Sequence, residues 1–128
     1  MSETAPKTIL IVDDEYSVRE VLTTFFEQEY GPRGYTVETA SDGAGALAAV
    51  RRRRPALVLL DIEMPGVNGV EALRGIRAID PGIPVIMVTG SESTRLAGDA
   101  IKGGAFSYLP KPVRLQYLEH IVATVLPT

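Results

Sequence analysis

Three acidic residues directly follow the first apolar run of the sequence. Residues 9–12 are all aliphatic, and Asp13, Asp14 and Glu15 come next. Carboxylates at the end of a buried strand need water or a partner, because an unpaired charge is costly to bury. Two unit charges ~4 Å apart repel by about 1 to 4 kcal/mol at realistic effective dielectrics. Clustered carboxylates of this kind therefore call for a cation.

Polar residues also follow three later apolar runs. They are Asp61 after residues 56–60, Thr89 after residues 84–88, and Lys111 beyond residues 105–109. In an open parallel sheet, ligands bind beyond the carboxyl ends of the strands, where the winding reverses. All-oxygen ligands suit Mg²⁺ or Mn²⁺, and a lysine with a hydroxyl suits a phosphoryl group. These parts predict phosphoryl transfer to a carboxylate nucleophile.

Short apolar runs alternate with segments of helical period along the whole chain. The runs predict strands at residues 8–12, 35–39, 56–60, 84–88 and 105–109. The helical periods predict helices over residues 18–26, 44–54, 69–79, 92–102 and 115–126. Ser17 and Glu20 have capping-box spacing near the first helix start. Five such units predict an α/β fold, a doubly wound parallel sheet with helices on both faces.

Composition narrows the class of protein. A chain of 128 residues favours one domain, and the absence of cysteine excludes disulfides and thiolate metal sites. His120 is the only histidine, which argues against histidine metal clusters and a Ser-His-Asp triad. The net charge of −3 argues against a general nucleic-acid binder. Residues 1–7 form a polar leader without the apolar region of a secretory signal, and no apolar stretch could span a bilayer, so we expect a cytoplasmic protein.

Four arginines at residues 51–54 invite a nucleic-acid interpretation. They stand before Pro55 at a predicted helix end, where cations suit the exposed carbonyl groups. A run of four also falls short of a basic patch, so we interpret it as a solvated helix end.

Four segments resemble the receiver domains of two-component response regulators. They are ILIVDDE, LLDIEMPGVNG, VIMVTGS and AIKGGAFSYLPKP, in the family's order and at its spacings. The resemblance covers nearly the whole chain. It implies a flavodoxin-like three-layer sandwich with a five-stranded parallel sheet of order 2-1-3-4-5 and five helices. It also implies a single receiver domain over residues 1–128, with no output domain in this chain.

By this resemblance, Asp61 within Asp-x-x-Met-Pro-x-x-x-Gly accepts phosphate from a kinase histidine. Asp14 would bind Mg²⁺ directly and Asp13 through water, while Asp61 and the backbone carbonyl of Glu63 would complete the metal site. Mn²⁺ could replace Mg²⁺. Glu63 and Ser91 would flank the pocket at positions that tune phosphate lifetime.

The resemblance implies a switch as well. Thr89 would hydrogen-bond the phosphoryl group, Lys111 would pair with it, and the aromatic Tyr108 would move inward as Thr89 shifts. The Lys111–Pro112 peptide bond would be cis, which would direct Lys111 into the pocket. A phosphoryl group adds about −1.5 to −2 charges. We expect it to shift the population of states on the face formed by the fourth helix, fifth strand and fifth helix.

The partners that this implies are proteins. A sensor histidine kinase or phosphotransfer protein would supply the phosphoryl group, and a downstream protein of unknown identity would receive the signal. No direct nucleic-acid or membrane contact is expected of this domain.

Three departures from the family pattern stand out. The segment EYGPRGY is longer than usual, which alters a surface loop away from the pocket. Val113 and Arg114 stand where a phenylalanine is common. Phe106 and Ser107 replace acidic residues that are usual in the DNA-binding class that dimerises through its fourth and fifth helices. The last departure counts against that mode of dimerisation.

Three alternatives remain open on sequence grounds. A receiver-like interaction module that never takes phosphate would fail to bind Mg²⁺. An aspartate-nucleophile phosphatase would use a second acid two residues after Asp61, where Glu63 stands, and would turn over a phosphoester repeatedly. A flavin-binding protein of the same winding would need a phosphate loop rich in Ser, Thr and Gly after the first strand, which this sequence lacks.

Overall fold

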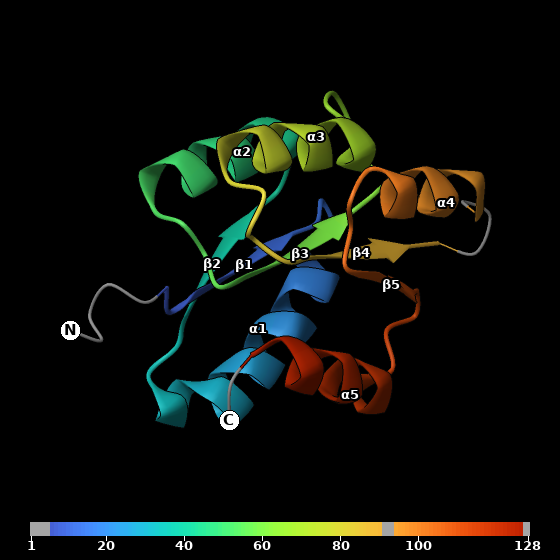
Figure 1. The fold of residues 1–128 in the computed structure, drawn as a ribbon. Helices are drawn as coiled ribbons and strands as arrows, with labels where there is room; N and C mark the ends of the chain where they lie inside the picture. The colour runs from blue at the N-terminus through green and yellow to red at the C-terminus, as the bar shows by residue number, and fades with distance from the viewer. Residues whose placement is uncertain (1–5, 91–93, 127–128) are drawn as a thin grey trace.

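The computed structural model describes residues 6–90 and 94–126, and within them five parallel strands form one sheet with helices on both faces (Figure 1). The strands are β1 (Thr8–Val12), β2 (Thr36–Ala40), β3 (Leu57–Asp61), β4 (Val85–Thr89) and β5 (Ser107–Pro110). The helices are α1 (Tyr16–Tyr30), α2 (Gly43–Arg52), α3 (Gly69–Ile79), α4 (Thr94–Lys102) and α5 (Leu115–Val125), with a 3-10 turn, η2 (Gly31–Arg33). The strand order β2-β1-β3-β4-β5 confirms the predicted fold.

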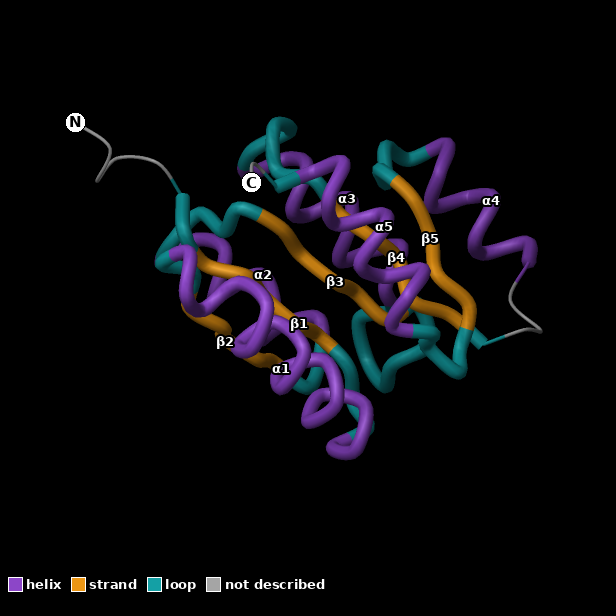
Figure 2. The backbone as a smooth tube through the Cα atoms, turned by 90° about the horizontal axis from the view of Figure 1, so that it is seen from below, coloured by secondary structure: helices purple, strands orange, loops and turns teal. Residues whose placement is uncertain are grey.

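Alternate residues of each central strand enter two separate cores. Ile9 and Ile11 of β1 pack with Phe26 on the face covered by α1 and α5. Leu10 and Val12 join the core beneath α2, α3 and α4. Figure 2 shows α1 and α5 lying across the same face of the sheet. Because both faces are covered, every residue of β1, β3 and β4 is buried, which explains their continuous apolar runs.

Four of the five predicted strands lie one or two residues too early in the sequence. The observed strands begin at residues 36, 57, 85 and 107 and end at residues 40, 61, 89 and 110. The difference arises because pairing continues to the carboxyl edge, where Asp61 is opposite Val88 and Thr89 is opposite Pro110. Asp61 and Thr89 are therefore the last residues of their strands, and the sheet fixes their backbones.

The predicted capping box at Ser17 and Glu20 is wrong. Helix α1 begins at Tyr16, with Glu15 as its N-cap residue. The Asp13 carboxylate accepts a hydrogen bond from the Glu15 amide (2.9 Å), so Asp13 turns the chain into the helix before Ser17 is reached. The structure places a capping box at α3 instead.

That capping box closes the loop that follows Asp61. The Asn68 side chain accepts from the Glu71 amide at 3.0 Å, and the Glu71 carboxylate accepts from the Asn68 amide at 3.2 Å. The Gly69 amide donates to the carbonyl of Ile62 at 2.7 Å. A Cβ at Gly69 would press on the Asp61 carbonyl and lie 2.5 Å from the Ile62 Cα. Only glycine lets α3 approach β3 this closely.

Helix α2 ends two residues earlier than predicted. Arg53 adopts an extended backbone, and the Arg54 guanidinium returns to donate to the Val50 carbonyl at 2.8 Å. Arg52 lies 3.6 Å from Glu38. All four arginines of residues 51–54 are exposed, which confirms the solvated helix end.

The long connection between α1 and β2 lies at the amino ends of the strands. Gly34 takes a left-handed conformation (φ 92°) after η2, and the buried rings of Tyr30 and Tyr35 pack edge to face 5.7 Å apart. This connection is at the opposite edge of the sheet from the ends of β3 and β4, as predicted.

Across the residues that the structure describes, no helix combines the length and apolar character needed to cross a bilayer.

Candidate functional site

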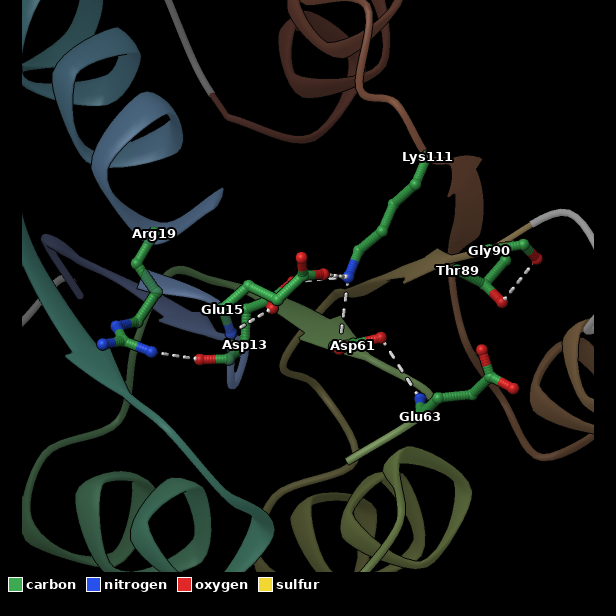
Figure 3. Close-up of polar contacts among 8 residues, drawn as sticks. All are labelled: Asp13, Glu15, Arg19, Asp61, Glu63, Thr89, Gly90 and Lys111. Atoms are coloured by element: carbon green, nitrogen blue, oxygen red, sulfur yellow. Dashed lines mark hydrogen bonds and ion pairs between the residues drawn. The ribbon is translucent and has the colours of Figure 1, made fainter. Parts of the chain in front are cut away.

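Four residues lie at the carboxyl edge of the sheet, and the Lys111 side chain contacts two of the others, Asp13 and Asp61. Asp13 follows β1, Asp61 ends β3, Thr89 ends β4 and Lys111 follows β5, and these strands are consecutive neighbours in the sheet (Figure 3). Asp13, Asp61 and Thr89 are buried, while Lys111 is half-buried. The peptide bond between Lys111 and Pro112 is cis. The winding of the fold thus brings together residues that are far apart in the sequence.

The Lys111 ammonium is surrounded by three carboxylates. Its Nζ lies 3.1 Å from Asp13 Oδ2 and 3.3 Å from Asp61 Oδ2. The closest contact is with Glu15 Oε1, at 2.9 Å. Burial alone would lower the pKa of Lys111, but its hydrogen bond with Glu15 and its contacts with Asp13 and Asp61 outweigh that effect, so the pKa is raised. Lys111 is therefore a permanent cation in this pocket.

Asp61 is held at both carboxylate oxygens. Oδ2 accepts from Lys111, and Oδ1 accepts from the Glu63 amide at 3.2 Å. Burial raises the pKa of this carboxyl and the nearby charge of Asp13 raises it further, so it reaches about 6 despite the opposing effects of Lys111 and Glu63. A strand-end carboxylate with a raised pKa is a basic nucleophile that is still largely ionised at pH 7.5.

Asp13 keeps one carboxylate oxygen without a hydrogen bond. Its Oδ1 accepts from the Glu15 amide, and its backbone carbonyl accepts from the Arg19 guanidinium at 2.7 Å. Its Oδ2 is buried and makes only the ion contact with Lys111. One carboxylate oxygen each of Asp13, Asp14 and Glu15 lie within 4.8 Å of one another. An all-oxygen donor set with a buried oxygen open to a further ligand fits Mg²⁺.

Three of the remaining predicted residues, Thr89, Tyr108 and Glu63, lie in the described structure. The Thr89 hydroxyl donates to the Gly90 carbonyl at 3.2 Å, directed away from Asp61 in Figure 3. The Tyr108 side chain is 46% exposed. The Glu63 side chain is exposed, and it is the backbone amide of Glu63 that contacts Asp61. Ser91 lies outside the described residues.

Sequence reasoning missed the position of Glu15. It predicted Asp13, Asp14, Asp61 and the Glu63 carbonyl as metal ligands, and in the structure Glu15 also lies beside Asp13 and Asp14. It did not foresee the contact between Glu15 and Lys111, which are 96 positions apart. The available signal was that Glu15 is the third acid of the run.

Comparison with known proteins agrees with this geometry. The profile of the family described as "Response regulator receiver domain" matches residues 9–123. Sporulation initiation phosphotransferase F from Bacillus subtilis is 36% identical over 119 residues, which cover 93% of this chain and 93% of that protein. The DNA-binding response regulator MtrA from Mycobacterium tuberculosis is 39% identical over 112 residues, or 88% of this chain and 47% of MtrA. The chain thus spans about half the length of several curated relatives that it matches.

Solved structures show the same fold. The receiver domain of NtrX from Brucella abortus superposes with a TM-score of 0.82 at 33% identity, covering 92% of this chain and 97% of that domain. A CheY-like receiver domain protein from Methanospirillum hungatei gives a TM-score of 0.83 at 33% identity, with 94% of each chain covered.

The fold and the site define a phosphoacceptor domain of two-component signalling. The chain belongs to the response regulator receiver domain family. Receiver domains take phosphate from histidine kinases, and they are parts of signalling proteins.

Proposed function

We propose that Asp61 is the phosphoacceptor of this receiver domain and that the chain acts as a single receiver unit. The observation that carries the proposal is the position of Asp61, a buried carboxylate at the end of β3 with the Lys111 ammonium 3.3 Å away. The donor would be a phosphohistidine of a sensor kinase or phosphotransfer protein. The proposed partners are proteins, and the proposal includes no nucleic-acid or membrane contact by this domain.

The transfer is a displacement at phosphorus. An oxygen of the ionised Asp61 carboxylate forms a bond to phosphorus while the P–N bond to the donor histidine breaks, and the electron pair of that bond leaves with the imidazole nitrogen. The product is an acyl phosphate on Asp61. Lys111 offsets the negative charge that accumulates, because its ammonium already lies beside the carboxylate. Hydrolysis of the same acyl phosphate returns Asp61 and inorganic phosphate, so the domain promotes its own phosphorylation and dephosphorylation.

A divalent cation completes the proposed site. Asp13, Asp14, Asp61 and the backbone carbonyl of Glu63 would hold Mg²⁺, or Mn²⁺ in its place. When bound, the cation would neutralise charge on the phosphoryl oxygens. The buried Asp13 Oδ2, which lacks a hydrogen bond, supports this assignment. Asp14 is exposed beside it and can turn toward a ligand.

The switch would run from the phosphoryl group to the outer strand. The Thr89 hydroxyl would exchange the Gly90 carbonyl for a phosphoryl oxygen, and Lys111 would remain on the same group. The half-exposed Tyr108 would then move inward and change the surface of α4, β5 and α5. Phe106, just before β5, is 51% exposed and Ile101 of α4 is 44% exposed, so this surface offers apolar contacts to a downstream protein. Glu63 and Ser91 would tune the lifetime of the phosphoryl group.

Intact mass spectrometry tests the phosphoacceptor directly. The wild-type protein, Asp61→Asn and Asp13→Asn are incubated with acetyl phosphate and Mg²⁺, with Asp99→Asn on the exposed side of α4 as a matched charge control. We expect one phosphoryl group on the wild type and on Asp99→Asn, much slower addition to Asp13→Asn, and none on Asp61→Asn. Equal labelling of Asp61→Asn would overturn the assignment. A wild type that neither gains a phosphoryl group nor binds Mg²⁺ would indicate an interaction module instead.

A further inference from the structure

Glu15 makes the shortest of the three contacts to the Lys111 ammonium. Its Oε1 lies 2.9 Å from Nζ, compared with 3.1 Å for Asp13 and 3.3 Å for Asp61. Figure 3 shows the Glu15 carboxylate reaching from the start of α1 to Lys111. The proposed transfer of the phosphoryl group to Asp61 does not use this side chain.

The local structure of α1 directs Glu15 toward Lys111. Glu15 is the N-cap residue, yet its side chain makes no capping hydrogen bond. Its backbone is fixed on both sides, because its amide donates to Asp13 Oδ1 and its carbonyl accepts from the Arg19 amide at 3.1 Å. The Glu15 side chain makes no hydrogen bond to the helix end and instead binds Lys111.

A phosphoryl group on Asp61 would need a place around the Lys111 ammonium. Of the three N–H donors of the ammonium, two donate to Glu15 and Asp61, and Asp13 lies 3.1 Å away as an ion pair. Asp13 and Asp61 are buried at the centre of the pocket, so neither side chain can turn out to water. The Glu15 side chain is 56% exposed and can exchange Lys111 for water at little cost. Glu15 is thus the partner that leaves.

We propose that Glu15 is a positioning residue that competes with the phosphoryl group for Lys111. In the unphosphorylated domain Glu15 holds the ammonium, and on phosphorylation it releases the ammonium to the phosphoryl oxygens. The proposal rests on the assignment of Asp61 as phosphoacceptor. Its consequence is that Glu15 weakens the binding of a phosphoryl group, so the wild-type sequence favours the unphosphorylated state more than a variant without this contact.

Two substitutions of Glu15 distinguish the effect of its contact with Lys111 from the effect of its negative charge. Glu15→Gln removes the charge, whereas Glu15→Asp keeps it on a side chain one methylene shorter, which does not span to Lys111. Glu20→Gln is the matched control, because Glu20 is exposed on the first turns of α1 and makes no contact with Lys111 in the described structure. Both positions are at the surface, so each of the three variants should fold, and thermal unfolding checks this.

The experiment is calorimetric titration with beryllium fluoride, an analogue of the phosphoryl group on aspartate, at saturating Mg²⁺. We expect Glu15→Gln and Glu15→Asp to bind with a dissociation constant about two- to fivefold below that of the wild type and Glu20→Gln. Structural damage would weaken binding, so tighter binding reports the loss of a competitor. Equal affinity of all four proteins overturns the proposal. Tighter binding by Glu15→Gln but not by Glu15→Asp also overturns it, because the negative charge of Glu15, and not its contact with Lys111, would then repel the phosphoryl analogue.

The same titration distinguishes this proposal from the one on which it rests. Asp61→Asn is included, and it should bind no beryllium fluoride. If the wild type binds and Asp61→Asn does not, the phosphoacceptor stands and the Glu15 variants decide the competition alone. If the wild type does not bind, or if Asp61→Asn binds equally well, both proposals fail.

Discussion

The ammonium of Lys111 lies 3.3 Å from the carboxylate of Asp61, although the two residues are 50 positions apart in the sequence. The contact joins the end of β3 to the segment after β5, across the intervening strand β4. Among the described residues, the two buried aspartates Asp13 and Asp61 share Lys111 as their paired cation. The stability of the fold and the chemistry of the site are therefore linked through Lys111.

Replacement of Lys111 by methionine should destabilise the metal-free protein at pH 7.5. Two buried carboxylates lose their shared counter-charge, and we expect the free energy of unfolding to fall by about 1–3 kcal/mol. Mg²⁺ should restore part of the loss, because it supplies positive charge to the same carboxylates. Urea unfolding with chelator and with Mg²⁺ measures both effects. Lys102→Met, on the exposed side of α4, is the control and should change little; an equal effect of both substitutions would contradict the linkage.

Asp61 should make the metal-free protein less stable as the pH rises. Burial and the charge of Asp13 raise its pKa from the ordinary 3.8 to about 6 in the folded state. The folded protein therefore holds this proton more tightly than the unfolded chain does. The stabilisation from that proton is fully present below pH 3.8 and is lost as the pH rises through about 6.

Asparagine does not titrate, so Asp61→Asn removes the pH dependence of stability that arises from Asp61. In chelator at pH 7.5 we expect it to be more stable than the wild type by about 2–3 kcal/mol, with the difference vanishing near pH 4. Urea unfolding of both proteins from pH 4 to pH 8 gives the difference between their free energies of unfolding at each pH. The other carboxylates titrate in both proteins, so their contribution cancels in this difference. The expectation fails if the difference does not change with pH. Asp99→Asn provides the baseline for an exposed carboxylate.

The sequence predicted the sheet well because burial on both faces leaves a simple pattern. β1 and β3 are continuous apolar runs, and the residues at their ends could be assigned to one edge from the winding alone. Strand ends were less accurate because they depend on pairing with neighbours, as where Asp61 continues β3 opposite Val88. The sequence of one strand does not show which residues of a neighbouring strand it pairs with.

The candidate site was likewise predictable only in part. Asp13, Asp61 and Lys111 were predicted to converge, and they do. The contact of Glu15 with Lys111 was not predictable, since it depends on how a side chain at the start of α1 is aimed in three dimensions. The start of α1 was misjudged at Ser17 for a related reason, because the Asp13 carboxylate begins the turn.

Gly69→Ala should damage both stability and phosphorylation. The added Cβ would meet the Asp61 carbonyl and lie 2.5 Å from the Ile62 Cα, so the loop after Asp61 must move. We expect a loss of about 2–3 kcal/mol in the free energy of unfolding and slower phosphorylation from acetyl phosphate. Gly98→Ala is the matched control, because Gly98 is exposed within α4 and an added Cβ there meets no other part of the described structure within 4 Å. Similar losses in both variants would show that the close approach at Gly69 is unimportant.

Tyr108 should lose solvent exposure when the proposed site is filled. Its side chain is now 46% exposed, and the Thr89 hydroxyl is bonded to Gly90 rather than to a phosphoryl oxygen. If Thr89 turns toward the phosphoryl group, the space it vacates accepts the tyrosine ring.

Solvent paramagnetic relaxation of the Tyr108 ring protons, measured before and after Mg²⁺ and beryllium fluoride are added, should fall by about half or more. In Thr89→Ala, where the hydroxyl is absent, beryllium fluoride should still bind but the Tyr108 relaxation should change much less, because the proposed link from the phosphoryl group to Tyr108 runs through that hydroxyl. A ring that stays exposed in the wild type with the analogue bound would separate Tyr108 from the switch and leave Thr89 as a phosphoryl ligand alone.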